Sequence, residues 1–153
     1  MDRGLGAELW RAQQAHRSAL YGALAAVGLT PPQYAALKLL EHTPGISSAA
    51  LARLAFVSAQ TMQAIVASLE RRRLLVRQAE HVGRVLAAWL TDDGLAVLAT
   101  AKCRALEVET RMTADLEDQE HRQLKQLLRR CATSLERPRR ESAVPMSERK
   151  DTP

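Results

Sequence analysis

The hydrophobic period changes halfway along residues 47–90, and this change restricts the folds that the segment can adopt. Apolar residues first recur at spacings of three and four, the pattern of an amphipathic helix: Met62, Ile65, Val66 and Leu69. Short β-compatible runs without that period follow. The segment therefore predicts, in order, helices over 48–54 and 59–72 and strands over 74–77 and 85–90. A short helix, a tight turn, a second helix and a β-ribbon together predict a winged helix-turn-helix.

Helical patterns flank this segment on both sides. Residue types that cap helix N-termini well stand at four predicted helix starts: Thr30, Ser47, Ser58 and Thr91. Outside the segment, the predicted helices cover residues 5–27, 31–41, 92–112 and 119–136. The expected order is α-α-α-α-β-β-α-α, a mainly α fold with a small β-hairpin wing. Prolines, serines and many charges in residues 137–153 predict a disordered tail.

Basic residues concentrate in the segment that would form the motif. The whole chain has 22 Lys and Arg against 17 Asp and Glu, a net charge of +5. Residues 53–84 contain six Arg against only Glu70 and Glu80. A basic balance of this kind favours polyanionic partners such as nucleic acid. The charge pattern therefore favours double-stranded DNA as the partner.

The second helix of the motif has side chains suited to reading DNA. A helix that enters the major groove needs small or polar residues on its leading face, as found at Ser58, Ala59, Gln60, Thr61 and Gln63. Three arginines at its far end are candidates for phosphate contacts: Arg71, Arg72 and Arg73. The predicted ribbon adds two more candidates, Arg84 for an adjacent minor groove and Arg77 at its flank. The same face could instead be an ordinary solvated helix surface.

At this point the chain resembles the MarR-type transcriptional regulators. The segments that carry the resemblance, in order and spacing, are 28–34 (GLTPPQY), 51–53 (LAR), 58–61 (SAQT), 69–72 (LERR) and 90–94 (LTDDG). The resemblance implies a homodimer that binds a pseudo-palindromic operator, usually as a repressor, with release by a small ligand or an oxidant. It also implies the domain division: a dimerisation helix over 1–29, a DNA-binding region over 30–90, dimerisation helices over 91–136 and the tail over 137–153.

Two departures from the family pattern bear on DNA binding. The family's wing usually reads Asp-x-Arg, whereas this chain has Val82, Gly83 and Arg84. The family also usually has Gly where this chain has Arg73, so that residue must adopt a less comfortable backbone state or a different helix end. A second hypothesis therefore stays open: a winged-helix protein-interaction module that has lost specific DNA binding.

The resemblance also implies an effector pocket between the DNA-binding region and the dimerisation helices, and four residues are candidates to line it: Trp10, Arg17, Tyr21 and His42. Each of the four is equally compatible with ordinary packing. The four histidines share no ligand spacing, so no metal site is expected. Nucleophile and phosphate-loop motifs are missing from the sequence, so neither an enzyme nor a cofactor is expected.

Cysteine usage and hydropathy indicate the compartment. Two cysteines do not form a secreted disulfide framework, and the apolar run over 20–29 is too short to span a bilayer. We therefore expect a cytoplasmic protein without a membrane segment. Cys103 and Cys131 lie on or beside apolar stripes, which predicts buried structural thiols. The family's peroxide sensors use a Cys near the start of the first helix, and this chain has none there, so that mode of sensing is disfavoured.

Overall fold

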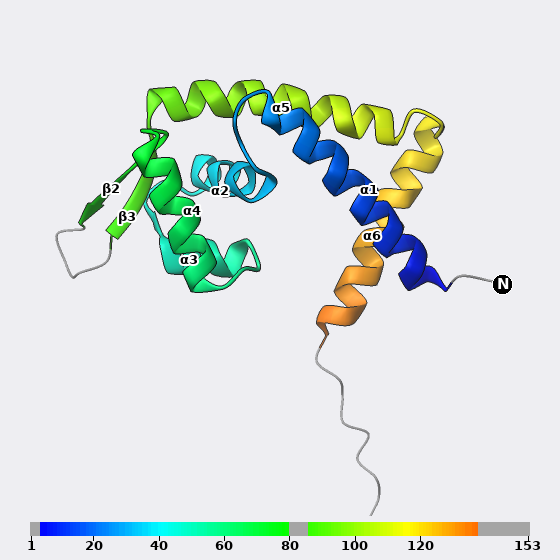
Figure 1. Ribbon diagram of the computed structural model, residues 1–153. Coiled ribbons are helices and arrows are strands. Elements are labelled where there is room, and N and C mark those ends of the chain that lie inside the picture. Colours follow the sequence, from blue (N-terminus) through cyan, green and yellow to red (C-terminus); the bar gives the residue numbers. More distant parts are fainter. Residues whose placement is uncertain (1–3, 80–85, 138–153) are drawn as a thin grey trace, which may run out of the picture. The chain divides into compact units, whose positions relative to one another are not determined.

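The computed structural model describes residues 4–79 and 86–137 (Figure 1). In chain order the elements are α1 (Leu5–Ala25), α2 (Pro31–His42), β1 (Ile46–Ser47), α3 (Ser48–Leu54), α4 (Ala59–Arg71), β2 (Leu75–Ala79), β3 (Leu86–Leu90), α5 (Asp92–Met112) and α6 (Asp118–Glu136). All predicted helices and both strands of the wing are present, so the mainly α fold with a β-hairpin wing is confirmed. The predicted tail lies outside the described residues beyond Arg137.

The helix starts are fixed by the caps that the sequence predicted. Thr30 accepts a hydrogen bond from the Gln33 amide while the Gln33 side chain accepts from the Thr30 amide, a complete capping box. Ser47, Ser58 and Thr91 each accept from the amide three residues later. These bonds satisfy amide groups that a helix leaves without partners in its first turn. The sequence therefore sets where α2, α3, α4 and α5 begin.

One core joins the elements up to α5. Its largest fully buried side chains come from α1, α2, α3, α4, β2 and α5: Leu24, Leu37, Leu40, Leu51, Met62, Val66, Leu69, Leu75 and Leu98. Three of the four apolar residues predicted on the inner face of α4 are among them, and Ile65 is half-buried. Figure 1 shows α2, α3 and α4 grouped below α5, with β2 and β3 beside α4. Burial of this stripe fixes which face of α4 remains exposed.

The sheet has three antiparallel strands in the order β1-β3-β2. β2 pairs with β3 from Leu75 opposite Leu90 to Ala79 opposite Leu86, which forms the base of the wing. β1, which the sequence did not predict, adds Ile46 and Ser47 to the other edge of β3. It is a strand only because β3 lies beside it, and the Gly45 amide extends the pairing to the Ala88 carbonyl.

The chain divides into two compact units at the boundary between Ala114 and Asp115. In the second unit, α6 is amphipathic: its apolar stripe, as predicted, is Leu124, Leu127, Leu128, Cys131 and Leu135. No residue of α6 is buried. No single helix among the described residues is long and apolar enough to cross a membrane.

The prediction of buried thiols is wrong, because Cys103 and Cys131 are both exposed. Cys103 follows the buried Ala101 by two residues, which places it about 200° around the helix, on the opposite face of α5. Cys131 does lie on the apolar stripe of α6, but no residue of that helix is buried. The error therefore has a different cause at each position.

Candidate nucleic-acid interface

α4 presents an uncharged polar surface at its N-terminal end. Its inner face is buried through Met62, Val66 and Leu69, so the residues between them point outward. The predicted base-contacting residues Ala59, Gln60, Thr61 and Gln63 are all exposed, as is Ser58 before them. The structure thus places these five residues together at one end of one helix. Their contact with bases stays a prediction.

The cap divides the roles among these residues. The Ser58 hydroxyl accepts from the Thr61 amide at 3.1 Å and lies 2.8 Å from the Thr61 hydroxyl. Both hydroxyls are thereby committed to the helix start. The side-chain amides of Gln60 and Gln63 each have donors and an acceptor, which is what bidentate pairing with adenine requires. Base readout through hydrogen bonds would therefore fall mainly to these two glutamines.

Sequence reasoning did not include two exposed side chains that precede α4 among the site candidates: Phe56 in the turn and Arg53 in the last turn of α3. Phe56 is 93% exposed and has a positive φ of 53°. Its amide donates to the carbonyl of Arg53, another exposed residue, at 3.3 Å. Since Phe56 is the only phenylalanine in the chain and stands in a tight turn, its position was a signal that could have been used.

Arg71 and Arg72, two of the predicted phosphate contacts, lie at the C-terminal end of α4. The Arg72 side chain is bonded within the molecule. Arg71 is exposed. The Arg72 guanidinium donates to the Gly28 carbonyl at 2.7 Å, which connects the end of α4 to the turn after α1. Gly28 has a φ of 67°, and a Cβ there would lie 3.3 Å from the Arg72 Nη2 atom. The structure therefore gives Arg72 a structural role, while its phosphate contact stays a prediction.

Replacing Arg72 with alanine is expected to lower the free energy of unfolding by about 1 kcal/mol, since one long-range hydrogen bond from a charged donor is lost. Arg71→Ala is the matched control, and its effect should stay within about 0.5 kcal/mol, as is usual for an exposed residue. Urea unfolding followed by circular dichroism, at one protein concentration, measures both. Equal unfolding midpoints for the two variants would mean that the contact with Gly28 adds nothing to stability.

Arg73 closes α4 in the left-handed conformation, with a φ of 59°. This confirms the backbone cost expected of a non-glycine residue at this position. Its carbonyl accepts from the Thr91 hydroxyl at 2.6 Å, which connects the end of α4 to the start of α5.

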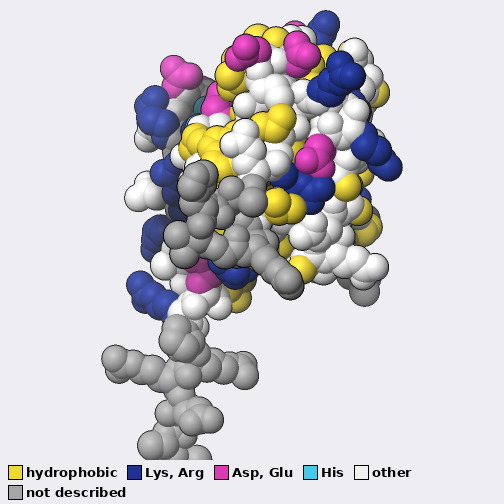
Figure 2. All heavy atoms as spheres, turned by 90° about the vertical axis from the view of Figure 1, so that its left-hand side faces the viewer, with side chains coloured by type: hydrophobic (Ala, Val, Ile, Leu, Met, Phe, Trp, Pro, Cys, Tyr) yellow, Lys and Arg dark blue, Asp and Glu magenta, His cyan; other side chains and the backbone are white. Residues whose placement is uncertain are grey.

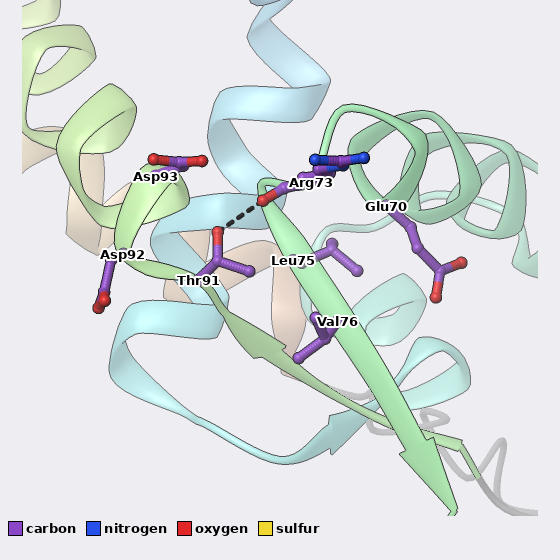
Figure 3. Close-up of a pocket in the computed structure, with 7 residues that line it drawn as sticks. All are labelled: Glu70, Arg73, Leu75, Val76, Thr91, Asp92 and Asp93. Atoms are coloured by element: carbon purple, nitrogen blue, oxygen red, sulfur yellow. Dashed lines mark hydrogen bonds between the residues drawn. The ribbon is translucent and has the colours of Figure 1, made fainter.

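The hydrogen bond between Thr91 and Arg73 lies within an open depression, which Figure 3 shows. The volume of the depression is about 520 Å³. The residues lining the depression are Glu70, Arg73, Leu75, Val76, Thr91, Asp92 and Asp93. Since three of them are acidic, the depression does not suit a phosphate backbone.

The wing is attached to α4 by an ion pair between Arg77 of β2 and Glu70 of α4. The Arg77 Nε atom donates to the Glu70 carboxylate at 2.9 Å, and a second guanidinium nitrogen bonds the same oxygen. The hydrogen bond from Arg77 holds the pKa of Glu70 below its usual value, and the same bond raises the pKa of Arg77. Both groups are therefore charged at neutral pH. The DNA contact predicted for Arg77 stays a prediction, and Arg84 lies outside the described residues, as do Val82 and Gly83.

The predicted effector residues are only partly brought together. Trp10, Arg17 and Tyr21 lie on α1, where the Arg17 guanidinium stands 5.7 Å from the centre of the Tyr21 ring. Trp10 is 64% exposed. His42 is at the end of α2, with its Nδ1 atom 3.9 Å from the Glu41 carboxylate. None of these four lines the depression in Figure 3.

On the face that Figure 2 shows, basic side chains are distributed rather than focused. Figure 2 views the molecule from the side on which β2 and β3 lie in Figure 1, and Lys and Arg side chains are spread there among polar and apolar ones. Within the described residues, no three His, Cys, Asp or Glu side chains are grouped to hold a metal ion. The exposed polar face of α4 is therefore the feature that best suits a nucleic acid.

Comparisons with known proteins agree with this geometry. The sequence model of the MarR family matches residues 27–84. The HTH-type transcriptional repressor Rv2887 of Mycobacterium tuberculosis is 35% identical over 133 residues, which is 86% of this chain and 96% of the relative. A crystal structure of Rv2887 in complex with DNA matches with a TM-score of 0.76 at 32% identity, covering 85% of this chain and 98% of that one.

Two further structures match over a similar length. Rv2887 in complex with salicylic acid has a TM-score of 0.71 at 34% identity and covers 85% of this chain and 97% of that one. The transcriptional repressor CouR, bound to a 23-mer DNA duplex, has a TM-score of 0.78 at 33% identity and covers 84% of this chain and 92% of that one. The likeness thus extends from the winged motif to most of the chain.

Proposed function

This chain belongs to the MarR family of transcriptional regulators, and from that premise we propose that it is a sequence-specific repressor that binds a pseudo-palindromic operator as a homodimer in the cytoplasm. The observation that carries the proposal is the exposed end of α4, where Gln60 and Gln63 stand free of the core beside a capped helix N-terminus. Such an end fits the major groove and can pair with base edges. Rv2887 and CouR, both named as transcriptional repressors, have solved structures in complex with DNA.

Exposed apolar residues on two helices support the homodimer. Leu5 and Leu9 of α1 are 76% and 51% exposed, and Leu135 of α6 is 86% exposed. Leu5 and Leu9 lie four residues apart on one face of α1, and Leu135 belongs to the apolar stripe of α6; an exposed apolar face on a helix marks association. A twofold dimer would present two α4 helices about 34–36 Å apart, one turn of DNA. Its operator would then have half-sites separated by about ten base pairs.

We also propose that a small aromatic acid releases the protein from DNA. Rv2887 has been crystallised with salicylic acid and with p-aminosalicylic acid. In this chain the Arg17 guanidinium beside the Tyr21 ring offers a cation for a carboxylate and an aromatic surface for a ring. Trp10 and His42 remain the other candidates for that site. Thermal shift of the purified protein with salicylate tests this, and no shift would argue against an effector of this class.

A protein-interaction module is the alternative, and one observation favours it. Arg72 and Arg77, both candidates for contact with DNA, are bonded within the molecule to Gly28 and Glu70. Fewer free cations mean fewer phosphate contacts and weaker DNA binding. In that case the exposed Arg71 and Arg73 would face an acidic partner protein.

In the deciding experiment, the purified protein is mixed with a pool of random DNA duplexes at near-physiological salt. The duplexes that it retains are then sequenced. An enriched palindrome with half-sites about ten base pairs apart is the expected result. Binding to it should weaken by about a thousandfold between roughly 50 and 200 mM salt, because each phosphate contact releases counterions. A folded protein that enriches no sequence would overturn the proposal and favour the interaction module.

A further inference from the structure

The turn between α3 and α4 exposes an aromatic ring that packing within the chain does not explain. Phe56 is 93% exposed, while its neighbours Ala55 and Val57 are packed against the core. The Phe56 amide donates to the Arg53 carbonyl, and the Val57 amide donates to the Ala52 carbonyl at 3.1 Å. These bonds fix the turn, so the ring is held outward by a defined backbone rather than by a loose loop.

The backbone at Phe56 is one that glycine or asparagine would adopt more readily. Its φ of 53° lies in the left-handed region, where a side chain is disfavoured. A large apolar side chain is therefore kept both in an unfavourable backbone conformation and in water. Strain of this kind gathers where a residue serves recognition rather than folding.

The position of the ring points to one partner. Phe56 precedes the N-cap Ser58 by two residues, so their Cα atoms lie within about 7.6 Å of each other. The ring thus borders the end of α4 that would enter the major groove. The exposed Arg53, one helical turn before it, adds a cation suited to a phosphate. An exposed ring at the rim of a groove suits the apolar group that DNA presents there, the thymine methyl.

We propose that Phe56 is a DNA-contacting residue that packs on a thymine methyl group at the edge of each half-site, and so adds a thymine preference to the readout by Gln60 and Gln63. This inference rests on the proposed function. The contact needs no rearrangement, because the ring already stands clear of the core. The alternative is that the Phe56 ring contacts a second copy of the chain instead of DNA. The test below distinguishes these two partners.

The test compares Phe56→Asn, Phe56→Gly and Phe56→Tyr with the wild-type chain on the duplex that the wild type selects. Asparagine and glycine suit the left-handed backbone, so their melting temperatures should equal or exceed that of the wild type. Their affinity for the duplex should fall about tenfold, because one apolar contact is lost in each of the two half-sites. Phe56→Tyr keeps the ring and should retain the affinity of the wild type.

The same experiment is repeated with uracil in place of each thymine in turn. At one position in each half-site the wild type should lose about fourfold in affinity, the contribution of one buried methyl group. Phe56→Asn should not respond to that uracil. If Phe56→Asn binds the duplex as tightly as the wild type does, the inference is overturned and the proposed function stands. The inference is also overturned if Phe56→Asn makes the dimer dissociate into monomers while the affinity of each remaining dimer for DNA is unchanged, because the ring would then contact a second copy of the chain. A wild type that retains no duplex overturns the proposed function and this inference together.

Discussion

Gly94→Ala is expected to lower the free energy of unfolding by about 3 kcal/mol or more, the largest effect on stability that we predict for a single methyl group. Gly94 is buried in the first turn of α5, and a Cβ there would lie 1.9 Å from the Leu74 carbonyl oxygen. That carbonyl also accepts from the Thr91 amide at 3.2 Å, and the Leu74 side chain is in the core. The backbone at Leu74 therefore cannot retreat without breaking contacts between the wing and α5.

The control for this variant is Gly22→Ala in the last turn of α1. A Cβ at Gly22 meets no atom within 4 Å, and alanine favours a helix over glycine. Its free energy of unfolding should rise by about 0.5–1 kcal/mol. Urea titrations at a fixed protein concentration compare the two variants. If Gly94→Ala unfolds at the urea concentration of the wild type, the close approach of α5 to Leu74 does not exist in solution.

Most of the fold could be predicted because residues close in sequence set where its helices begin. Thr30, Ser58 and Thr91 set helix starts through bonds to amides three residues away, and such short-range chemistry is visible in the sequence. The inner face of α4 was equally readable from its spacing. What failed depended on distant partners. β1 is a strand only beside β3, and the apolar stripe that contains Cys131 predicted burial although no residue of α6 is buried.

The candidate site was predictable in its residues and less so in their roles. Gln60 and Gln63 are exposed as the periodicity requires. The sequence could not show that Arg72 would reach Gly28, 44 positions away, or that Arg77 would pair with Glu70. A guanidinium is a long side chain with several donors, so its partner is decided by the folded surroundings. The exposure of Phe56 likewise follows from the turn geometry and not from residue type.

Gln60→Glu is expected to lower the affinity for the selected operator by about a hundredfold or more while leaving the fold intact. The change is nearly isosteric, but it places a carboxylate on the leading end of α4, beside phosphates and base acceptors of like charge, where such contacts cost several kcal/mol. Gln60 is the second residue of α4, where a negative charge instead stabilises a helix by about 0.3–1 kcal/mol. Stability and affinity should therefore move in opposite directions, which separates a lost contact from a lost fold.

Gln119→Glu is the matched control, because Gln119 is exposed and is the second residue of α6. It makes the same change of charge at the same helical position, in a helix that is not part of the winged motif. Since Gln119 belongs to no part of the motif that would contact DNA, and salt screens an exposed charge that makes no close contact, the affinity of this variant should stay within about twofold of the wild type. Fluorescence anisotropy with a labelled operator measures both, and thermal melting shows that both are folded. Equal affinities for the two variants would mean that the end of α4 does not enter the groove, whereas an equal loss in both would mean that only net charge governs binding.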